Sequence, residues 1–242
     1  MSMNEDKYRH ELKYLINEPE ISSIMTRLSP IMTLDPNATE VGYVIRSIYF
    51  DDMWQSAYEE KNMGIFGRKK YRIRIYNYSD KSIKLERKKK QGNYIFKESA
   101  SLTRSEVEDI ICGRYDFLLK SDNKLLREFY IECISNYMRP RTIVDYERIP
   151  YIMQEGTVRV TFDRNVRSAV LSNDIFDSEL PTMEVLEPGK LVMEVKYTEF
   201  LPQVIRDVVP PKSHEMVAVS KYVLSCDMTR YLYGWGYYNQ EV

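Results

Sequence analysis

Charged residues recur at every second position in several segments that have the alternating pattern of β-strands. Side chains two residues apart in a strand point to the same face of the sheet. The charged residues that share a face in this way are Arg9, Glu11 and Lys13; Arg72 and Arg74; Lys84, Glu86 and Lys88; and Glu194 and Lys196. Arginine binds phosphate oxygens through paired donors, and lysine acts as a mobile point charge. Glutamate in the same rows can hold Mg²⁺ or Mn²⁺, which bridges phosphate oxygens.

The position of these charged faces decides what they can do. An alternating strand ordinarily turns its charged face to solvent, and this interpretation suits any one of the strands alone. The opposite faces, which carry Ile73, Ile75 and Leu85, are apolar enough to pack under helices. Cations crowded into a lumen repel one another and cost stability when no ligand is present. We therefore favour a closed antiparallel β-barrel, covered outside by helices, whose lumen binds a polyanion and a divalent cation.

The composition makes the positive charge local. The 242 residues include 35 Lys and Arg against 36 Asp and Glu, for a net charge of −1. This balance argues against a general nucleic-acid coat or a polybasic membrane binder. Between Lys61 and Lys97, however, 13 basic residues stand against two acidic ones, Asp80 and Glu86. The sequence thus predicts a strong positive field over one part of the molecule only.

Cysteine usage and hydropathy indicate a reducing, aqueous compartment. Cys112, Cys133 and Cys226 have no CxxC spacing and occur in apolar helical contexts, so we predict buried free thiols and no metal site. No apolar run approaches the roughly 18 residues of a membrane span, and no signal peptide precedes the first charged residues. We expect a cytoplasmic protein.

The periodicities predict one domain, residues 1–242, of antiparallel α+β architecture. Helices are expected after Asn17, between the capping pair Thr103 and Glu106 and the stop at Gly113, and from Ser121 onward. Two more are expected at 200–208 and 219–231. The expected strands are 8–16, 44–50, 71–78, 82–90, 94–98, 137–148, 157–163 and 191–197.

Eight short motifs occur in order along the chain. They are Tyr8–Tyr14 (YRHELKY), Tyr49–Asp51 (YFD), Tyr71–Arg74 (YRIR), Leu85–Lys88 (LERK), Tyr146–Arg148 (YER), Arg159–Asp163 (RVTFD), Met193–Tyr197 (MEVKY) and Ser220–Tyr222 (SKY). Together they resemble the catalytic domain of the vacuolar transporter chaperone (VTC) polyphosphate polymerases, in the CYTH or triphosphate tunnel metalloenzyme superfamily. The resemblance implies a β-tunnel that grips ATP or another nucleoside triphosphate and a polyphosphate chain.

The resemblance also implies roles for individual residues. The implied phosphate ligands are Lys13, Arg72, Arg74, Lys88, Lys97, Arg148, Arg159 and Lys221, with Lys61 as a weaker match. Lys84 shares a strand face with Lys88, and Lys196 shares one with Glu194; both are added as substrate-binding residues. Glu194 matches the family's metal-binding glutamate, and Glu11 and Glu86 complete the predicted set for Mn²⁺ or Mg²⁺. The sequence departs from the family pattern where Arg9 replaces a superfamily glutamate and where Ala218 replaces a lysine.

Three functions fit these residues. The first is a polymerase that transfers the γ-phosphate of ATP to a polyphosphate end and releases ADP. The second is a tunnel hydrolase, which needs a carboxylate base; the candidates are Glu11, Glu86 and Glu184. The third is a non-catalytic module that binds polyphosphate or nucleotide, favoured if Ala218 marks a decayed site.

Other features of the sequence carry less chemistry. His10 and His214 are expected to be structural, and the aromatic segment 231–238 to cap the barrel or to meet a partner. The expected partners are ATP and polyphosphate, with no nucleic acid. Any export of the product would need a separate membrane protein.

Overall fold

The computed structural model describes residues 10–92, 94–198, 200–209 and 217–233, which fold around one antiparallel sheet. Its main path runs in the order β1 (His10–Asn17), β10 (Lys190–Tyr197), β8 (Val158–Ala169), β7 (Arg139–Met153), β3 (Tyr43–Asp51), β4 (Gly67–Tyr76), β5 (Ser79–Gln91) and β6 (Tyr94–Leu102). Two short strands lie off this path: β2 (Thr33–Leu34) pairs with β7, and β9 (Thr182–Glu184) pairs with β8. The α+β class that the sequence predicts is confirmed.

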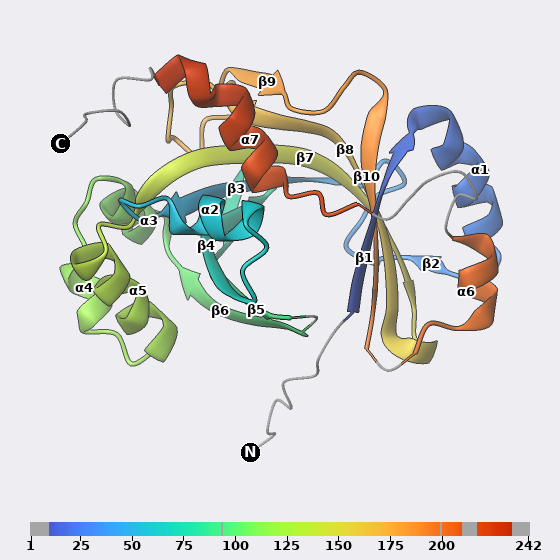
Figure 1. Cartoon of the computed structure of the whole chain (residues 1–242), viewed down its shortest axis with the longest axis horizontal. Coiled ribbons are helices and arrows are strands. Elements are labelled where there is room, and N and C mark those ends of the chain that lie inside the picture. The colour runs from blue at the N-terminus through green and yellow to red at the C-terminus, as the bar shows by residue number, and fades with distance from the viewer. Residues whose placement is uncertain (1–9, 93, 199, 210–216, 234–242) are drawn as a thin grey trace.

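Helices pack on the sheet in three groups (Figure 1). At one end α1 (Glu18–Leu28) lies beside α6 (Gln203–Val208), and at the other end lie α3 (Arg104–Ile111), α4 (Asp116–Leu119) and α5 (Lys124–Ser135). Between them α2 (Ser56–Asn62) and α7 (Lys221–Thr229) lie close to each other. Short 3₁₀ turns occupy Glu155–Thr157 and Arg230–Tyr233. Within the described residues, no helix combines the length and apolar character that crossing a membrane requires.

The prediction of a closed β-barrel is wrong. Among the described residues, the strand ladder ends at β1 on one side and at β6 on the other, and these two strands do not pair. Part of the free edge of β1 is taken instead by the segment that precedes α7, because the Val217 amide donates to the Lys13 carbonyl oxygen (2.9 Å). Across the remaining gap, the Lys88 Nζ on β5 reaches a Glu11 carboxylate oxygen on β1 (2.6 Å). A side-chain ion pair between β1 and the inner strand β5 thus spans this gap.

The apolar faces of the strands are buried where alternation predicts. Ile73, Ile75 and Leu85 are fully buried in a cluster that also contains Phe129 of α5. A second cluster joins β8 and β10 to α1 and α6, and a third packs α7 against β7 and β8. Burial of these side chains is the main favourable term of folding. Because the apolar faces of β4, β5, β1 and β10 are covered by these clusters, the charged faces of the same strands must face each other or solvent.

Most predicted elements occur with shifted ends. The strand expected at 71–78 begins earlier, at Gly67, and ends at Tyr76, whereas α2, α4, β2 and β9 were not predicted. The capping pair is confirmed, because the Glu106 amide and the Thr103 amide each bond to the other residue's side chain. One thiol prediction is wrong, since Cys112 is exposed at the end of α3 while Cys133 and Cys226 are buried. Tyr8, Arg9, His214 and residues 234–238 lie outside the described residues.

A buried ion pair between β3 and β7 was not predicted. Arg46 and Asp145 are each 1% exposed and are joined by two hydrogen bonds of 2.8 and 2.7 Å. The guanidinium also donates to the carbonyl oxygens of Ile175 and Asp177, so it fixes the loop after β8. Removing one partner of such a pair leaves an uncompensated buried charge, which costs about 3–5 kcal/mol.

The substitution Asp145→Ala is therefore expected to lower the free energy of unfolding by about 3 kcal/mol or more. The measurement is urea unfolding followed by circular dichroism. Asp80→Ala, on an exposed aspartate, is the control and should change stability by less than about 0.5 kcal/mol. Equal stability of the two variants would contradict the assigned role of the ion pair.

Candidate functional site

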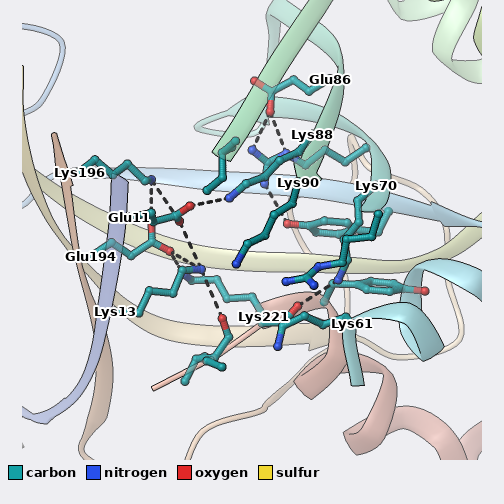
Figure 2. Close-up of a pocket in the computed structure, with 18 of the residues that line it drawn as sticks. Glu11, Lys13, Lys61, Lys70, Glu86, Lys88, Lys90, Glu194, Lys196 and Lys221 are labelled. Carbon is teal, nitrogen blue, oxygen red and sulfur yellow. Dashed lines mark hydrogen bonds and ion pairs between the residues drawn. The ribbon is translucent and has the colours of Figure 1, made fainter. Parts of the chain in front are cut away.

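The charged strand faces line one cavity of about 460 Å³ (Figure 2). Its walls come from β1, β10, β7, β3, β4, β5, β6, α2 and the segment 217–222. Eleven cations line it: Lys13, Lys61, Arg68, Lys70, Arg72, Arg74, Lys88, Lys90, Arg148, Lys196 and Lys221. The three lining carboxylates are Glu11, Glu86 and Glu194. This excess of positive charge in a concave, partly buried space is what a polyanion site requires.

On one wall, acidic and basic residues alternate along β1 and β10, and opposite charges face each other across the two strands. The register places Glu11 opposite Lys196 and Lys13 opposite Glu194. The Lys13 Nζ lies 3.4 Å from a Glu11 oxygen and 3.2 Å from a Glu194 oxygen, and the Lys196 Nζ lies 2.6 Å from the other Glu194 oxygen. Opposite charges directly across an antiparallel pair stabilise the sheet. The two carboxylates thereby share the same lysines.

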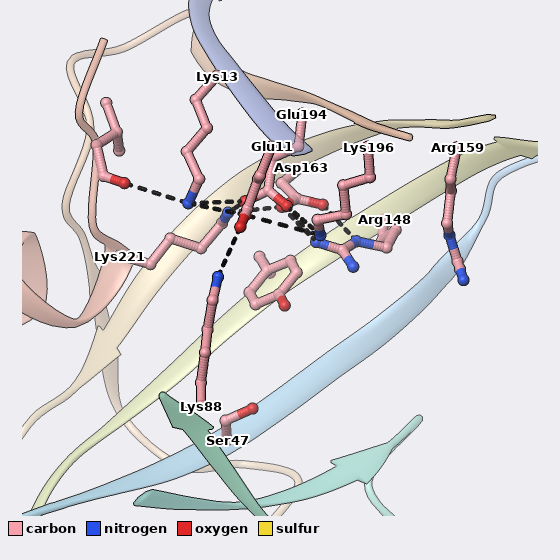
Figure 3. Close-up of polar contacts among 12 residues, drawn as sticks. Glu11, Lys13, Ser47, Lys88, Arg148, Arg159, Asp163, Glu194, Lys196 and Lys221 are labelled. Carbon is pink, nitrogen blue, oxygen red and sulfur yellow. Dashed lines mark hydrogen bonds and ion pairs between the residues drawn. The ribbon is translucent and has the colours of Figure 1, made fainter. Parts of the chain in front are cut away.

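Glu194 and Asp163 hold the cations at the base of this wall (Figure 3). Asp163 is fully buried and accepts two hydrogen bonds of 2.7 Å from the Arg148 guanidinium and an ion pair of 2.6 Å from Lys221. Glu194 lies 3.2 Å from the Lys221 Nζ and 3.6 Å from Arg148. The site thus joins β7, β8, β10 and α7. Asp163 is part of a quoted motif, but the sequence assigned it no role.

Glu86 organises the opposite wall. It accepts hydrogen bonds from Arg72 at 2.7 and 2.8 Å, forms an ion pair with Lys97, and lies 3.9 Å from Arg74. The two arginines also donate to tyrosine hydroxyls, Arg72 to Tyr49 (2.9 Å) and Arg74 to Tyr146 (3.1 Å). Guanidinium groups fixed in this way can meet phosphate oxygens without further loss of side-chain freedom.

The proton equilibria of the site follow from burial and crowding. Burial alone would raise the pKa of Glu11 and of Glu86, but their cationic neighbours outweigh it and hold both pKa values well below 4.5. Burial lowers the pKa of Lys88 to about 8, although Glu11 acts against it. Burial, with Lys61 nearby, lowers the pKa of Lys70 to about 7. The carboxylates are therefore ionised near neutral pH, while these two lysines lose protons easily.

The structure brings most predicted site residues together, but not all. Lys84 shares the strand face of Lys88, yet its Nζ bonds to the Ser101 hydroxyl (2.7 Å) and does not line the cavity. Arg159 also lies outside, paired with Asp35 at 3.0 Å, and stands apart from the cluster in Figure 3. Lys97 lies behind Glu86 rather than in the lining. Glu184, a candidate base, lies on β9 away from this cavity.

Three lining cations were missed by the sequence analysis. Arg68, Lys70 and Lys90 face the cavity with Arg72 and Lys88. Strand parity would have found them, because each is two residues from a predicted site residue or from another of the three. The strand was expected to begin at Tyr71, which hid Arg68 and Lys70.

The carboxylates fit a divalent cation only in part. Glu11 and Glu194 share lysines on one wall, and Mg²⁺ is commonly held by one or two carboxylates together with substrate phosphates. Glu86 belongs to the opposite wall, so the three predicted metal ligands do not form one cluster. Among the described residues, no group of three or more His, Cys, Asp or Glu side chains is placed to hold a metal ion. An ion held by Glu11 and Glu194 would complete its coordination with water or substrate oxygens.

The fold is similar to that of solved structures of two candidate adenylyl cyclases. A candidate adenylyl cyclase from Hippeastrum with a dominant triphosphatase activity superposes with a TM-score of 0.54 at 11% identity, covering 92% of this chain and 96% of its own. A candidate adenylate cyclase from Bacillus halodurans has a TM-score of 0.50 at 9% identity, covering 86% of this chain and 95% of its own. The search of curated proteins found no match.

The family follows from the sequence match. The model of the VTC domain matches residues 8–230, which is most of the chain. The chain therefore belongs to the VTC domain family, as its ordered motifs indicate.

The buried carboxylates make stability depend on acid pH. Because the folded state holds the pKa of Glu86 below 4.5, its contribution is present above that pH and is lost as the pH falls. Glu86→Gln is expected to cost roughly 2–3 kcal/mol at pH 7 and clearly less at pH 3. Urea midpoints at both pH values measure this, with the exposed Glu108→Gln as control. A loss that is the same at both pH values would refute the assignment.

Proposed function

We propose that the protein is a metal-dependent polyphosphate polymerase that transfers the γ-phosphate of ATP to the end of a polyphosphate chain and releases ADP. Membership of the VTC domain family supports the polyphosphate chemistry. The observation that carries the proposal is a cavity whose described lining brings eleven cations together with three carboxylates. Such a lining suits an anionic donor together with an anionic acceptor.

The reaction needs positioning and charge neutralisation more than acid–base help. A terminal phosphate oxygen of the chain attacks the γ-phosphorus, the bond from that phosphorus to the β,γ-bridging oxygen breaks, and ADP leaves with the bond electrons. The nucleophile is already ionised near neutral pH. Arg72 and Arg74, held by Tyr49 and Tyr146, and Arg148, held by Asp163, can orient the phosphates. A divalent cation on Glu194 and Glu11 would neutralise phosphate charge.

Hydrolysis is less well supported, because it requires a base that activates water. A carboxylate base works best when its pKa lies near the operating pH. Glu11, Glu86 and Glu194 are all ion-paired, and their pKa values are held below the ordinary value. They therefore accept a proton poorly. The third function is binding without turnover, and it was linked to Ala218, which lines the cavity. The matched lysine three residues later, Lys221, is held in the cavity by Asp163 and Glu194, so this part of the motif is in place.

We place this reaction in the cytoplasm, where ATP is abundant and free thiols such as Cys133 and Cys226 stay reduced. Delivery of the product across a membrane would be the task of a separate membrane protein.

Incubation of the protein with ATP and Mn²⁺ or Mg²⁺ is expected to yield long acid-labile polymer and ADP. Gel electrophoresis of the polymer and chromatography of the nucleotide measure both products. Release of inorganic phosphate without polymer would indicate a hydrolase. Binding of ATP without turnover would indicate a non-catalytic module.

The cavity assignment predicts different effects for two lysines on the same face of β5. Lys88→Met removes a lining cation and should lower kcat/KM roughly 100-fold, the usual cost of losing one charge-stabilising donor. Lys84→Met, outside the lining, should change it less than about threefold. Similar losses in both variants would contradict the cavity as the reaction site.

The metal assignment makes a separate prediction. Glu194→Gln should abolish turnover, while tripolyphosphate still binds in EDTA because the cations remain. Circular dichroism serves as the control for folding. Unchanged turnover in this variant would remove Glu194 from the metal site.

A further inference from the structure

Like charges face each other across two neighbouring strands on the cavity side. The register of β4 and β5 places Arg68 opposite Lys90 and Lys70 opposite Lys88. Like charges directly across an antiparallel pair are destabilising. One step further along the same face, Arg72 lies opposite Glu86, so the arrangement returns to a favourable pair. Arg74 lies opposite Lys84 beyond that pair, but Lys84 does not line the cavity and Arg74 lies 3.9 Å from Glu86. The like-charge pairs whose two members both line the cavity are thus at one end of it.

The outer face of the same two strands provides an internal comparison. There Lys69 lies opposite Lys89, which is again a pair of like charges. Each of these lysines has an acidic partner: Lys69 pairs with Glu132, and Lys89 lies 3.6 Å from Glu98. On the outer face, both lysines of the like-charge pair have an acidic partner. On the cavity face, Lys88 is the one member of the two like-charge pairs for which a carboxylate partner is described.

Four cations make up this end of the cavity, and we call them the basic quartet: Lys61, Arg68, Lys70 and Lys90. Within the described part of the chain, none of the four forms an ion pair with a carboxylate, whereas Lys88 is paired with Glu11. Lys70 instead bonds to the Ser220 hydroxyl (3.3 Å) and stands 4.8 Å from the centre of the Tyr222 ring. Figure 2 shows Lys61 and Lys70 on the side of the cavity away from Glu11 and Glu194, while Lys90 extends into the space between the two sides.

We propose that the basic quartet is a second anion subsite, which binds the metal-free phosphates of the polyphosphate acceptor. The assignment rests on the proposed polymerase function and divides its cavity into two parts. The wall with Glu11 and Glu194 can take a nucleotide together with a divalent cation, because the ion needs carboxylate oxygens. The quartet offers no such oxygen, so it suits phosphates that carry their full negative charge.

A transferase with two anionic substrates needs two such subsites, and a hydrolase needs one. The donor must be held with its γ-phosphorus in line with the attacking oxygen, while the rest of the acceptor lies elsewhere. Lys88 lies between the two parts, opposite Lys70 in the sheet and paired with Glu11 on the other wall. The acceptor end would therefore meet the donor phosphate near Lys88.

Proton uptake should accompany acceptor binding. Burial and the neighbouring cations lower the pKa of Lys70 to about 7, and a bound polyanion would favour its protonated form. Lys70 is charged below this pKa and loses its charge as the pH rises through it, so acceptor affinity should fall between pH 6.5 and pH 8.5. The titratable groups that face Lys70 are Lys61 on α2, Asp51 on β3, Arg68 on β4, Lys88 on β5, and Tyr222 and Cys226 on α7.

The test measures binding of tripolyphosphate in EDTA by isothermal titration calorimetry. The variant Arg68→Gln/Lys90→Gln should bind at least roughly tenfold more weakly than the unaltered protein. The matched control Lys69→Gln/Lys89→Gln removes the same number of charges from the same strands on the outer face, and it should lose less than about threefold. Equal losses in the two variants would overturn the subsite, because they would show a general effect of net charge.

Kinetics separate this proposal from the polymerase proposal. In a polymerising preparation, the quartet variant should raise the KM for added polyphosphate and leave the KM for ATP within about twofold. A rise in the KM for ATP alone would overturn the acceptor assignment while leaving the polymerase intact. If the protein makes no polymer, the titration in EDTA still decides whether the quartet binds phosphate. The unliganded variant should be at least as heat-stable as the unaltered protein, because repulsion is removed.

Discussion

Eleven lysine and arginine side chains share one cavity with three glutamates, so mutual repulsion is the constraint that the rest of the site has to satisfy. The fold meets it by sharing each acid among several cations. Glu194 alone contacts Lys13, Lys196, Lys221 and Arg148. Because these partners come from different strands and from α7, the ion pairs also hold the secondary structure elements together. The same contacts that fix the site thus close the fold.

The ion pairs matter for the fold because the sheet is open. A closed barrel would hold its two edges by backbone hydrogen bonds, which are indifferent to the ligand. Here β1 and β5 meet through Lys88 and Glu11, and part of the β1 edge is covered through Val217. A polyanion that competes for Lys88 would act directly on this contact between β1 and β5. Bound polyphosphate would then supply the negative charge that the cavity lining lacks.

Strand parity predicted which face each charged residue occupies, but it could not predict depth or closure. Arg72 and Lys88 line the cavity as expected, whereas Lys84 has the same parity and lies beyond the cavity. Alternation repeats along the whole strand, so it contains no information on where the cavity ends. The prediction of a closed barrel was wrong for a related reason. Pairing between β1 and β6 depends on the twist of the sheet and on the segment before α7 that covers part of β1, and neither can be read from alternation. Lys70 was missed only because a strand end was placed a few residues too late.

Under the proposed function, the division of acids within the cavity would let a chain with a net charge of −1 bind two polyanions at separate places. A uniformly positive lumen would hold any phosphate equally well at any point. Acids on one wall lower the local potential and offer oxygen ligands to a divalent cation, so that wall favours phosphates that bring a metal ion. The end lined by Arg68 and Lys90 has the opposite preference, since only a bare polyanion relieves its repulsion. Selectivity between the two proposed substrates would then follow from the placement of Glu11 and Glu194 on that wall.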